Sequence, residues 1–337
     1  MLQLKNETPF KTAFAKFPNK DGVDTLYLVV TATFNLEPRL ELAEEQLSPI
    51  LSDEYVDQPG RSSLRCSGEL HIGKPATDVI VAGYARAPGG KPITTLQVGV
   101  RVGRQDKMLS VTGDRHWLGM EPSKPAPFTE LPLIYELAFG GELRVDGAVV
   151  ETDDRNPLGV GLGISRMRAK IRDPLPNIED PRQPLREGAN CVPAGFGCIP
   201  GAWLPRRSLV GTYDENWQRT RAPYLPQDFK PEFLNSAAEG LTFRPHLKGG
   251  EPLLLVGMSE RGPIRSAIPT CLLETAFMLR GELHRTACHL QTVFIEPDSK
   301  RLRLTFHTEF VCDKLALEVE RIHLKLERLD VTVSASS

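Results

Sequence analysis

Apolar side chains recur at every second position early in the chain. From Leu26 to Leu36 one side of the segment is apolar, while Thr31 and Thr33 lie on the other side. This period of two, with its β-branched and aromatic residues, predicts a strand with one buried face. Similar runs follow at residues 79–85, 96–102 and 109–112, and the turn signal APGG lies at 87–90. Together they predict an antiparallel meander with one buried face.

The last third of the chain repeats this pattern. Apolar runs at residues 253–258, 290–295 and 302–310 predict strands, the last two joined by a turn at 296–301. The tail at 314–329 fits a helix, or a strand with a one-residue bulge near Glu320, and we favour the strand because its neighbours are strands. TFNLEP at 33–38 resembles VFIEP at 293–297. Either a duplicated β unit or turn chemistry alone explains that likeness.

Residues 151–250, here called the belt, have no hydrophobic period and contain 12 Pro and 11 Gly. Proline and glycine exclude a long regular helix. Disordered segments are poor in aromatic residues, but the belt keeps many. We therefore expect an ordered, irregular segment with short helical turns at 214–217, capped by Asp214, and at 231–235, opened by Pro231.

These patterns predict a mainly β protein. Two antiparallel, sandwich-like β-rich lobes, residues 1–150 and 251–337, would be joined by the belt, and a single domain is the alternative. The length of 337 residues is compatible with either arrangement.

Composition removes several classes of function. A formal net charge of −2 gives no field that would attract nucleic acid or an anionic membrane. The first residues lack the apolar core of a secretion signal, and no stretch reaches the ~20 apolar residues of a membrane span. We expect a soluble, cytoplasmic protein whose six cysteines are mostly reduced, with a Cys191–Cys198 disulfide as the alternative.

No motif for catalysis, metal or cofactor binding stands out. GVGLG at 159–163 lacks the GxGxxG spacing of a dinucleotide loop. His284 and Cys288, with the adjacent His289, could contribute to a metal site, but no other residue with ligand spacing lies close in sequence. We expect no enzyme activity, no cofactor and no small-molecule substrate. Aromatic and arginine residues interleave in the belt, where they either hold it together or anchor a protein partner. The candidate partner-binding residues are Trp203, Arg206, Arg207, Tyr213, Trp217, Arg221, Tyr224, Phe229 and Phe233.

An ordered series of short motifs resembles a bacterial family, domain of unknown function 2169. The series spans about residues 25 to 310 and consists of VAGYARAPGG at 81–90, GDRHW at 113–117, LPLIYELAFGG at 131–141, RNPLG at 155–159, AN at 189–190, GFGCIP at 195–200, WLPRR at 203–207, GTYDENW at 211–217, RAPYLP at 221–226 and DFKPEFLN at 228–235. Cys191 and Cys198 depart from the proline or small residues usual in the family, which affects local turn geometry.

The resemblance implies an adaptor or chaperone of type VI secretion. Such a protein would bind an effector, or its PAAR-type tip region, in the cytoplasm and promote its loading onto the spike. It implies no catalytic residues. Two alternatives remain: a hydrolase whose site involves Asp114, His116 and Asp214, or a structural component of the spike or baseplate.

Overall fold

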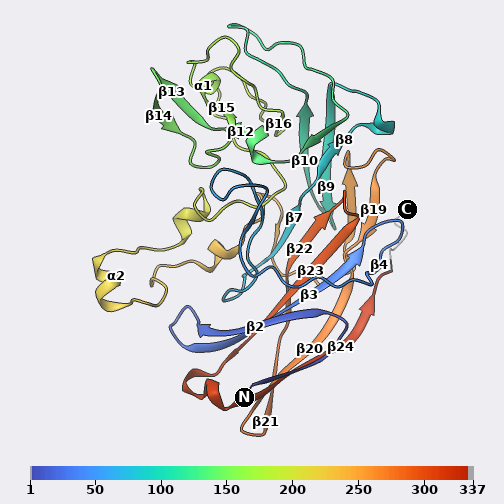
Figure 1. The fold of residues 1–337 in the computed structure, drawn as a ribbon, viewed down its shortest axis with the longest axis vertical. Coiled ribbons are helices and arrows are strands. Elements are labelled where there is room, and N and C mark those ends of the chain that lie inside the picture. The colour runs from blue at the N-terminus through green and yellow to red at the C-terminus, as the bar shows by residue number, and fades with distance from the viewer. Residues whose placement is uncertain (1, 333–337) are drawn as a thin grey trace.

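The computed structural model describes residues 2–332, which form a mainly β protein with three larger sheets (Figure 1). The central sheet has the strand order β17-β7-β22-β23-β3-β2, with β4 paired to β3. Its strands are β2 Lys11–Pro18, β3 Asp24–Asn35, β4 Glu41–Leu42, β7 Thr77–Val81, β17 Thr242–Phe243, β22 His289–Glu296 and β23 Arg301–Val311.

Two further sheets flank it. The terminal sheet, in the order β1-β24-β20-β21, contains β1 Gln3–Glu7, β20 Thr270–Leu279, β21 Glu282–Thr286 and β24 Val319–Asp330. The five-stranded sheet, in the order β16-β10-β9-β18-β19, contains β9 Thr95–Val102, β10 Gln105–Thr112, β16 Ile178–Glu179, β18 Pro252–Val256 and β19 Ile264–Ala267.

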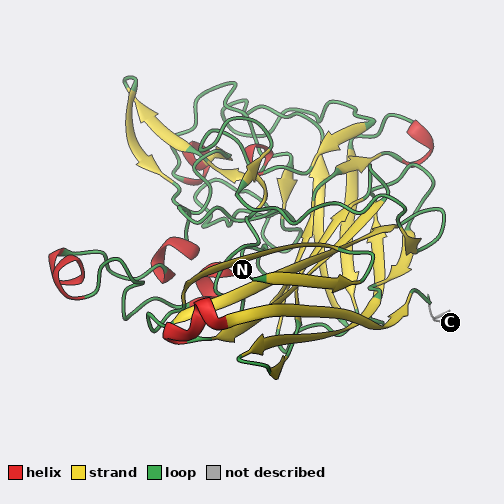
Figure 2. Cartoon of the chain, turned by 60° about the horizontal axis from the view of Figure 1, so that its bottom comes forward, coloured by secondary structure: helices red, strands yellow, loops and turns green. Residues whose placement is uncertain are grey.

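Short pairs and helical turns complete the fold, and loops connect most of them (Figure 2). The paired strands are β5 Glu54–Tyr55 with β6 Leu64–Cys66, β8 Tyr84–Arg86 with β11 Glu130–Pro132, β12 Phe139–Gly140 with β15 Val160–Gly161, and β13 Glu142–Val145 with β14 Ala148–Thr152. The helices are η1 Pro88–Gly90, η2 Tyr135–Leu137, α1 Leu162–Ser165, η3 Arg206–Leu209, α2 Glu215–Thr220, η4 Pro231–Leu234 and η5 Asp313–Glu318.

Several predictions from periodicity are confirmed. Strand β3 covers the alternating run from Leu26, and β22 and β23 form the expected hairpin. Asp214 caps α2 by accepting a 2.8 Å hydrogen bond from the backbone N–H of Trp217. Pro231 opens η4. The tail is strand from Val319, and its pairing with β20 skips Glu320, the expected bulge position. The predicted strand is wrong over residues 314–318, which belong to η5.

The predicted meander is wrong, although its strands exist. Strand β7 lies in the central sheet beside β17 and β22, whereas β9 and β10 form a hairpin in the five-stranded sheet. The chain changes sheets between them, where β8 pairs with β11. Alternation reports which residues share a face of a strand, but it carries no information on which strands pair.

The sheets do not follow the predicted boundaries at residues 150 and 251. β3 pairs with β23, β9 with β18, and β1 with β24, so early and late segments share all three larger sheets. Apolar residues of these sheets form one continuous buried cluster, with Phe34, Val100, Leu304 and Ile322 among its members. These long-range pairings are not encoded in local sequence patterns.

Candidate functional site

The central sheet has a second face that is polar and nevertheless buried. Adjacent strands align Thr31 with Thr305, and Asp78 with Thr292, on this face. The prediction of one buried face for β3 is therefore wrong, since Tyr27, Thr31 and Thr33 are all buried. Residues 44–76 cover the face and bond to it through Gln46, Glu69 and Lys74.

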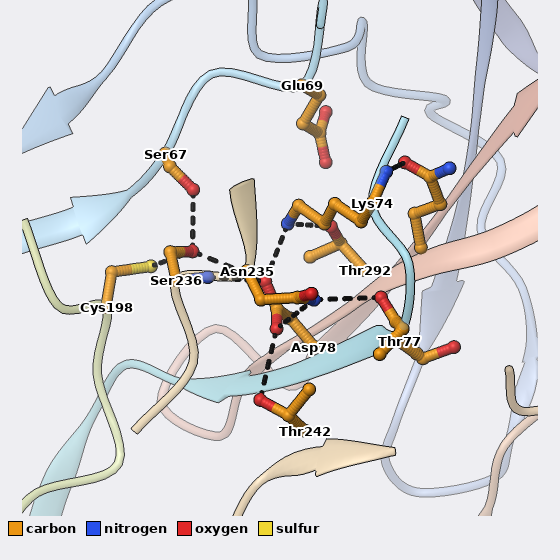
Figure 3. A network of polar contacts seen from close by, with 12 residues as sticks. Ser67, Glu69, Lys74, Thr77, Asp78, Cys198, Asn235, Ser236, Thr242 and Thr292 are labelled. Atoms are coloured by element: carbon orange, nitrogen blue, oxygen red, sulfur yellow. Dashed lines mark hydrogen bonds and ion pairs between the residues drawn. The ribbon is translucent and has the colours of Figure 1, made fainter. Parts of the chain in front are cut away.

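A buried ion pair lies at the centre of this polar face (Figure 3). Lys74 Nζ lies 2.8 Å from Asp78 Oδ2 and donates to Thr292 Oγ1 at 3.0 Å. The two charged side chains are 1% and 0% exposed. Burial alone would lower the pKa of Lys74, but the charge and hydrogen bond of Asp78 outweigh it and raise that pKa. Lys74 is thus a sequestered cation, unsuited to act as a base or nucleophile.

Asp78 also holds the belt to the sheet. Its Oδ1 accepts from Asn235 Nδ2 at 2.9 Å and its Oδ2 from the backbone N–H of Ser236 at 2.8 Å. Ser236 Oγ lies 2.7 Å from Ser67 Oγ and donates to Cys198 Sγ at 3.6 Å (Figure 3). A network with every member bonded fixes the relative positions of the segments that contribute to it.

A second carboxylate, Glu69, is buried in the same layer. Glu69 accepts hydrogen bonds from Thr305 Oγ1 and, at 2.9 Å, from the backbone N–H of Ile50. Burial raises the pKa of Glu69. The guanidinium of Arg303 lies 4.8 Å from the centroid of the Phe294 ring. The hydrogen bond from Thr305 to Glu69 joins the cover of residues 44–76 to the central sheet.

A cavity of about 580 Å³ opens beside this network. It lies between the ends of β22 and β23, residues 72–75, the β2–β3 turn and Pro231. Within residues 2–332, no group of three or more His, Cys, Asp or Glu side chains has a geometry that could hold a metal ion. Gln291 and His307 are among the residues that line the cavity.

The belt contains a projecting segment, residues 209–230, here called the arm. Figures 1 and 2 both show α2 at the far end of this segment, away from the sheets. A hydrogen bond of 3.0 Å from the Lys230 N–H to the Leu209 carbonyl closes its base, and Thr212 Oγ1 donates to Asp228 at 2.7 Å. These contacts make the arm an ordered loop.

Aromatic rings gather on the arm. Tyr213 and Trp217 meet edge to face at 4.7 Å, and Trp217 Nε1 donates to the Tyr224 carbonyl at 2.8 Å. Tyr213 is 49% exposed and Tyr224 40% exposed. Arg221 Nη2 donates to the Lys20 carbonyl at 2.6 Å, which ties the arm to the β2–β3 turn. The arm thus presents fixed rings to solvent.

The other candidate partner-binding residues are buried or form contacts within the protein. Trp203, Arg206 and Phe229 are buried. Arg206 donates to the Phe233 carbonyl at 2.9 Å, and its guanidinium lies 5.0 Å from the centroid of that ring. Arg207 is exposed and pairs with Asp154 at 2.6 Å. The nine predicted residues therefore do not form one exposed surface, since some are buried within the belt and others, on and beside the arm, are exposed.

The candidate hydrolase residues make separate contacts. Asp114 accepts from Asn177 Nδ2 at 2.9 Å, while Asp214 serves as the cap of α2. The backbone N–H of His116 donates to Ser123 Oγ at 3.0 Å. No hydrogen bond joins any two of the three candidates in the part of the chain that the structure describes.

Sequence reasoning missed the buried network. Its residues come from five separated segments and match no motif spacing. The only local signal is the pair Lys74 and Asp78, four residues apart, which in a sequence is indistinguishable from a solvated pair. All six cysteines are free thiols, so the alternative Cys191–Cys198 disulfide is not formed.

Two of the sequence motifs, LPLIYELAFGG and RNPLG, pack directly against each other. Asn156 Nδ2 donates to the carbonyls of Tyr135 and Phe139 at 2.8 and 2.9 Å. A Cβ on Gly141 would lie 2.1 Å from the Gly159 carbonyl oxygen, so only glycine fits there. These residues therefore set a close backbone contact between the two motifs.

A comparison with protein families finds a match over most of the chain. The family described as "Uncharacterized protein conserved in bacteria (DUF2169)" matches residues 21–307. The chain belongs to the DUF2169 family. No curated protein and no solved structure shows a significant match. Among residues 2–332, no helix has the length and apolarity needed to cross a bilayer. The arm and the buried network both lie within the DUF2169 region.

Proposed function

We propose that this DUF2169 protein is a non-catalytic adaptor of type VI secretion. It binds an effector, or the PAAR-type tip region of that effector, in the bacterial cytoplasm and promotes its loading onto the spike. The observation that carries the proposal is the arm, an ordered projection on which contacts position the Tyr213 and Trp217 rings and the Tyr224 ring is partly exposed.

Physical reasons favour protein binding at such a structure. Tyrosine and tryptophan are the most frequent anchors of protein interfaces. The Trp217 ring is already fixed by a hydrogen bond, so it loses little conformational freedom when a partner covers it. The tie from Arg221 to Lys20 keeps the arm close to the body, so a bound partner also meets the β2–β3 turn.

Deleting the gene and measuring the amount and secretion of the effector encoded beside it tests the role. The proposal expects the effector to become unstable and its secretion to fall. Unchanged effector stability and secretion would exclude an adaptor role. Stoichiometric presence of the protein in the assembled apparatus would instead favour a structural component.

Co-purification of purified variants with the same effector tests the surface. Tyr213→Ala and Tyr224→Ala are expected to weaken capture. Phe14→Ala is the matched control, because Phe14 is a similarly exposed ring, 41% exposed, on β2. Equal capture by all three variants would remove the arm from the interface.

A further inference from the structure

Two nearly buried side chains of the cavity beside the network each keep one polar atom without a hydrogen-bond partner among residues 2–332. The cavity is bordered by Lys20 and Asp21 of the β2–β3 turn, by Gly73, and by Pro231 immediately after the arm. Gln291 and His307 form part of its wall and are only 5% and 2% exposed. Nearly buried polar atoms without partners indicate a place where a ligand group would be favourable.

His307 supplies a hydrogen-bond acceptor. Its Nε2 lies 2.8 Å from the His71 carbonyl oxygen, and because a carbonyl can only accept, Nε2 carries the proton. Burial lowers the pKa of His307 to about 4, so the ring is neutral at neutral pH. Nδ1 is then left with a lone pair, and it has no hydrogen-bond partner among residues 2–332. Stacking on the His71 ring, with centroids 5.3 Å apart, fixes its orientation.

Gln291 supplies a donor. Its Oε1 accepts from the backbone N–H of Lys74 at 2.9 Å, which assigns Nε2 to the other side of the amide. Gln291 is the extra residue of a bulge in β22, between Leu290 and Thr292, and a bulge redirects a side chain away from the regular pleat. Nε2 has no partner within the described chain.

The donor Gln291 Nε2 and the acceptor His307 Nδ1 both lie beside Gly73. A Cβ built on Gly73 would lie 3.4 Å from Gln291 Nε2 and 3.6 Å from His307 Nδ1. Gly73 has φ +98°, a conformation that disfavours other residues. The missing side chain leaves the space between the two atoms open to a ligand.

We propose that this cavity binds a peptide group of an extended segment of the partner protein. Gln291 Nε2 would donate to the carbonyl oxygen of that group, and His307 Nδ1 would accept from an N–H. A peptide group offers one uncharged acceptor and one uncharged donor, which matches this pair. The nearest buried cation, Lys74, is already neutralised by Asp78 and does not demand an anion.

The place of the cavity favours a polypeptide over a free small molecule. Pro231 follows the arm directly, and the adjoining turn residue Lys20 is bonded to Arg221 of the arm. A chain held by the arm would therefore run past the mouth of the cavity. The inference rests on the proposed function for the identity of the partner, while the amide chemistry of the cavity can be tested independently.

The test uses the full-length protein and the capped peptide N-acetyl-tetraalanine methylamide in ligand-observed saturation-transfer NMR. Ala287→Trp places a bulky ring at an exposed rim residue, and Ala287→Ser is its matched control. We expect binding to the wild type and to Ala287→Ser, and binding at least about tenfold weaker to Ala287→Trp, as expected for loss of about two hydrogen bonds.

A second pair of variants tests the chemistry. Gln291→Glu keeps the acceptor for Lys74 and replaces the donor, and it should weaken binding of the capped peptide. Gln97→Glu makes the same change at an exposed position of β9 and should have no effect. Thermal melting identifies any variant that is unfolded. If Gln291→Glu is unfolded, the comparison of Ala287→Trp with Ala287→Ser alone decides whether the cavity binds the peptide.

Absence of binding to the wild type, or equal binding by Ala287→Trp, would overturn the inference. Tighter binding of free L-glutamine than of the capped peptide would also overturn it, in favour of a small-molecule site. If Ala287→Trp still captures the effector through the arm but no longer binds the peptide, the adaptor role remains supported. If the wild-type protein does not capture the effector, the adaptor role is excluded, while the result of the capped-peptide experiment is unaffected.

Discussion

Lys74 and Asp78 form the most deeply buried ion pair among residues 2–332, with Nζ and Oδ2 2.8 Å apart and both side chains almost fully enclosed. Asp78 also accepts hydrogen bonds from Asn235 and Ser236. One carboxylate thus links the cover over the polar face, the central sheet and the belt.

Asp78→Asn is expected to lower the free energy of unfolding by about 3–5 kcal/mol, because it leaves the buried Lys74 cation without a counter-charge. Urea denaturation measures this loss. Asp154→Asn is the control, since the Arg207–Asp154 pair is exposed and should contribute less than ~1 kcal/mol. Equal midpoints for the two variants would show that the buried pair adds nothing to stability.

The stability of the protein should fall on mild acidification because of His307. Its pKa, about 4 in the folded state, lies below the ordinary value of 6.5, mainly because of burial. Between these values the unfolded chain binds a proton that the folded protein does not, so the free energy of unfolding decreases as pH falls from 6.5 to 4 and levels off below. The contribution is at most about 3 kcal/mol.

Denaturant melts at several pH values between 7.5 and 4 measure this dependence. His307→Gln should show a shallower slope than the wild type across that interval. His116→Gln, a change at an exposed loop position, should keep the wild-type slope. Parallel curves for the wild type and His307→Gln would contradict the assignment.

Gly141 and Gly147 allow the contact between the two family motifs to be measured. Both have positive φ, +89° and +84°, so alanine costs roughly 1–2 kcal/mol of backbone strain at either position. At Gly147 a Cβ meets nothing within 4 Å, but at Gly141 it would lie 2.1 Å from the Gly159 oxygen.

Gly141→Ala should therefore destabilise the protein by about 1–3 kcal/mol more than Gly147→Ala, the usual cost of overpacking. Thermal or urea unfolding of the two variants gives the difference directly. If both variants melt together, the close approach of residues 141 and 159 does not constrain the fold.

Two tryptophans of the belt should respond differently to truncation. Trp203 is buried and packs edge to face on Tyr135 at 5.7 Å, so Trp203→Ala should cost about 3–5 kcal/mol of stability. Trp217 lies on the arm, and Trp217→Ala should leave the melting temperature of the body nearly unchanged. It should weaken effector binding by about 2 kcal/mol or more.

Melting curves and binding isotherms of the same two preparations make this comparison. A Trp217→Ala protein that is normal in both measurements would show that the ring neither supports the arm nor anchors a partner. A large loss of stability in that variant would instead place Trp217 among the structural residues of the belt.

Local features of the fold could be predicted from sequence because their causes are local. Alternation identified β3, β22 and β23, a side-chain cap identified α2, and an interrupted period identified the bulge at Glu320. The pairing of β7 with β22 and of β9 with β18 depends on contacts between distant segments. No short sequence pattern specifies such contacts.

The candidate site was predictable only in part, for the same reason. Tyr213, Trp217 and Tyr224 were identified because aromatic residues in an irregular segment are unusual. The polar residues under residues 44–76 resemble surface residues in the sequence, since a threonine on a strand gives the same pattern whether water or another segment covers it. In Gln291 and His307, one polar atom of each side chain forms a hydrogen bond within the fold and the other is left without a partner among residues 2–332. The sequence does not show which atom is bonded.

The order of strands in the central sheet has a consequence for synthesis on the ribosome. Strand β3 pairs on one edge with its immediate neighbour β2, but on the other edge Leu26 pairs with Phe310. In the terminal sheet, β1 likewise pairs with β24. During synthesis the second edge of the apolar strand β3 therefore stays unpaired until β23 has been translated, and β1 gains its partner only after β24 follows.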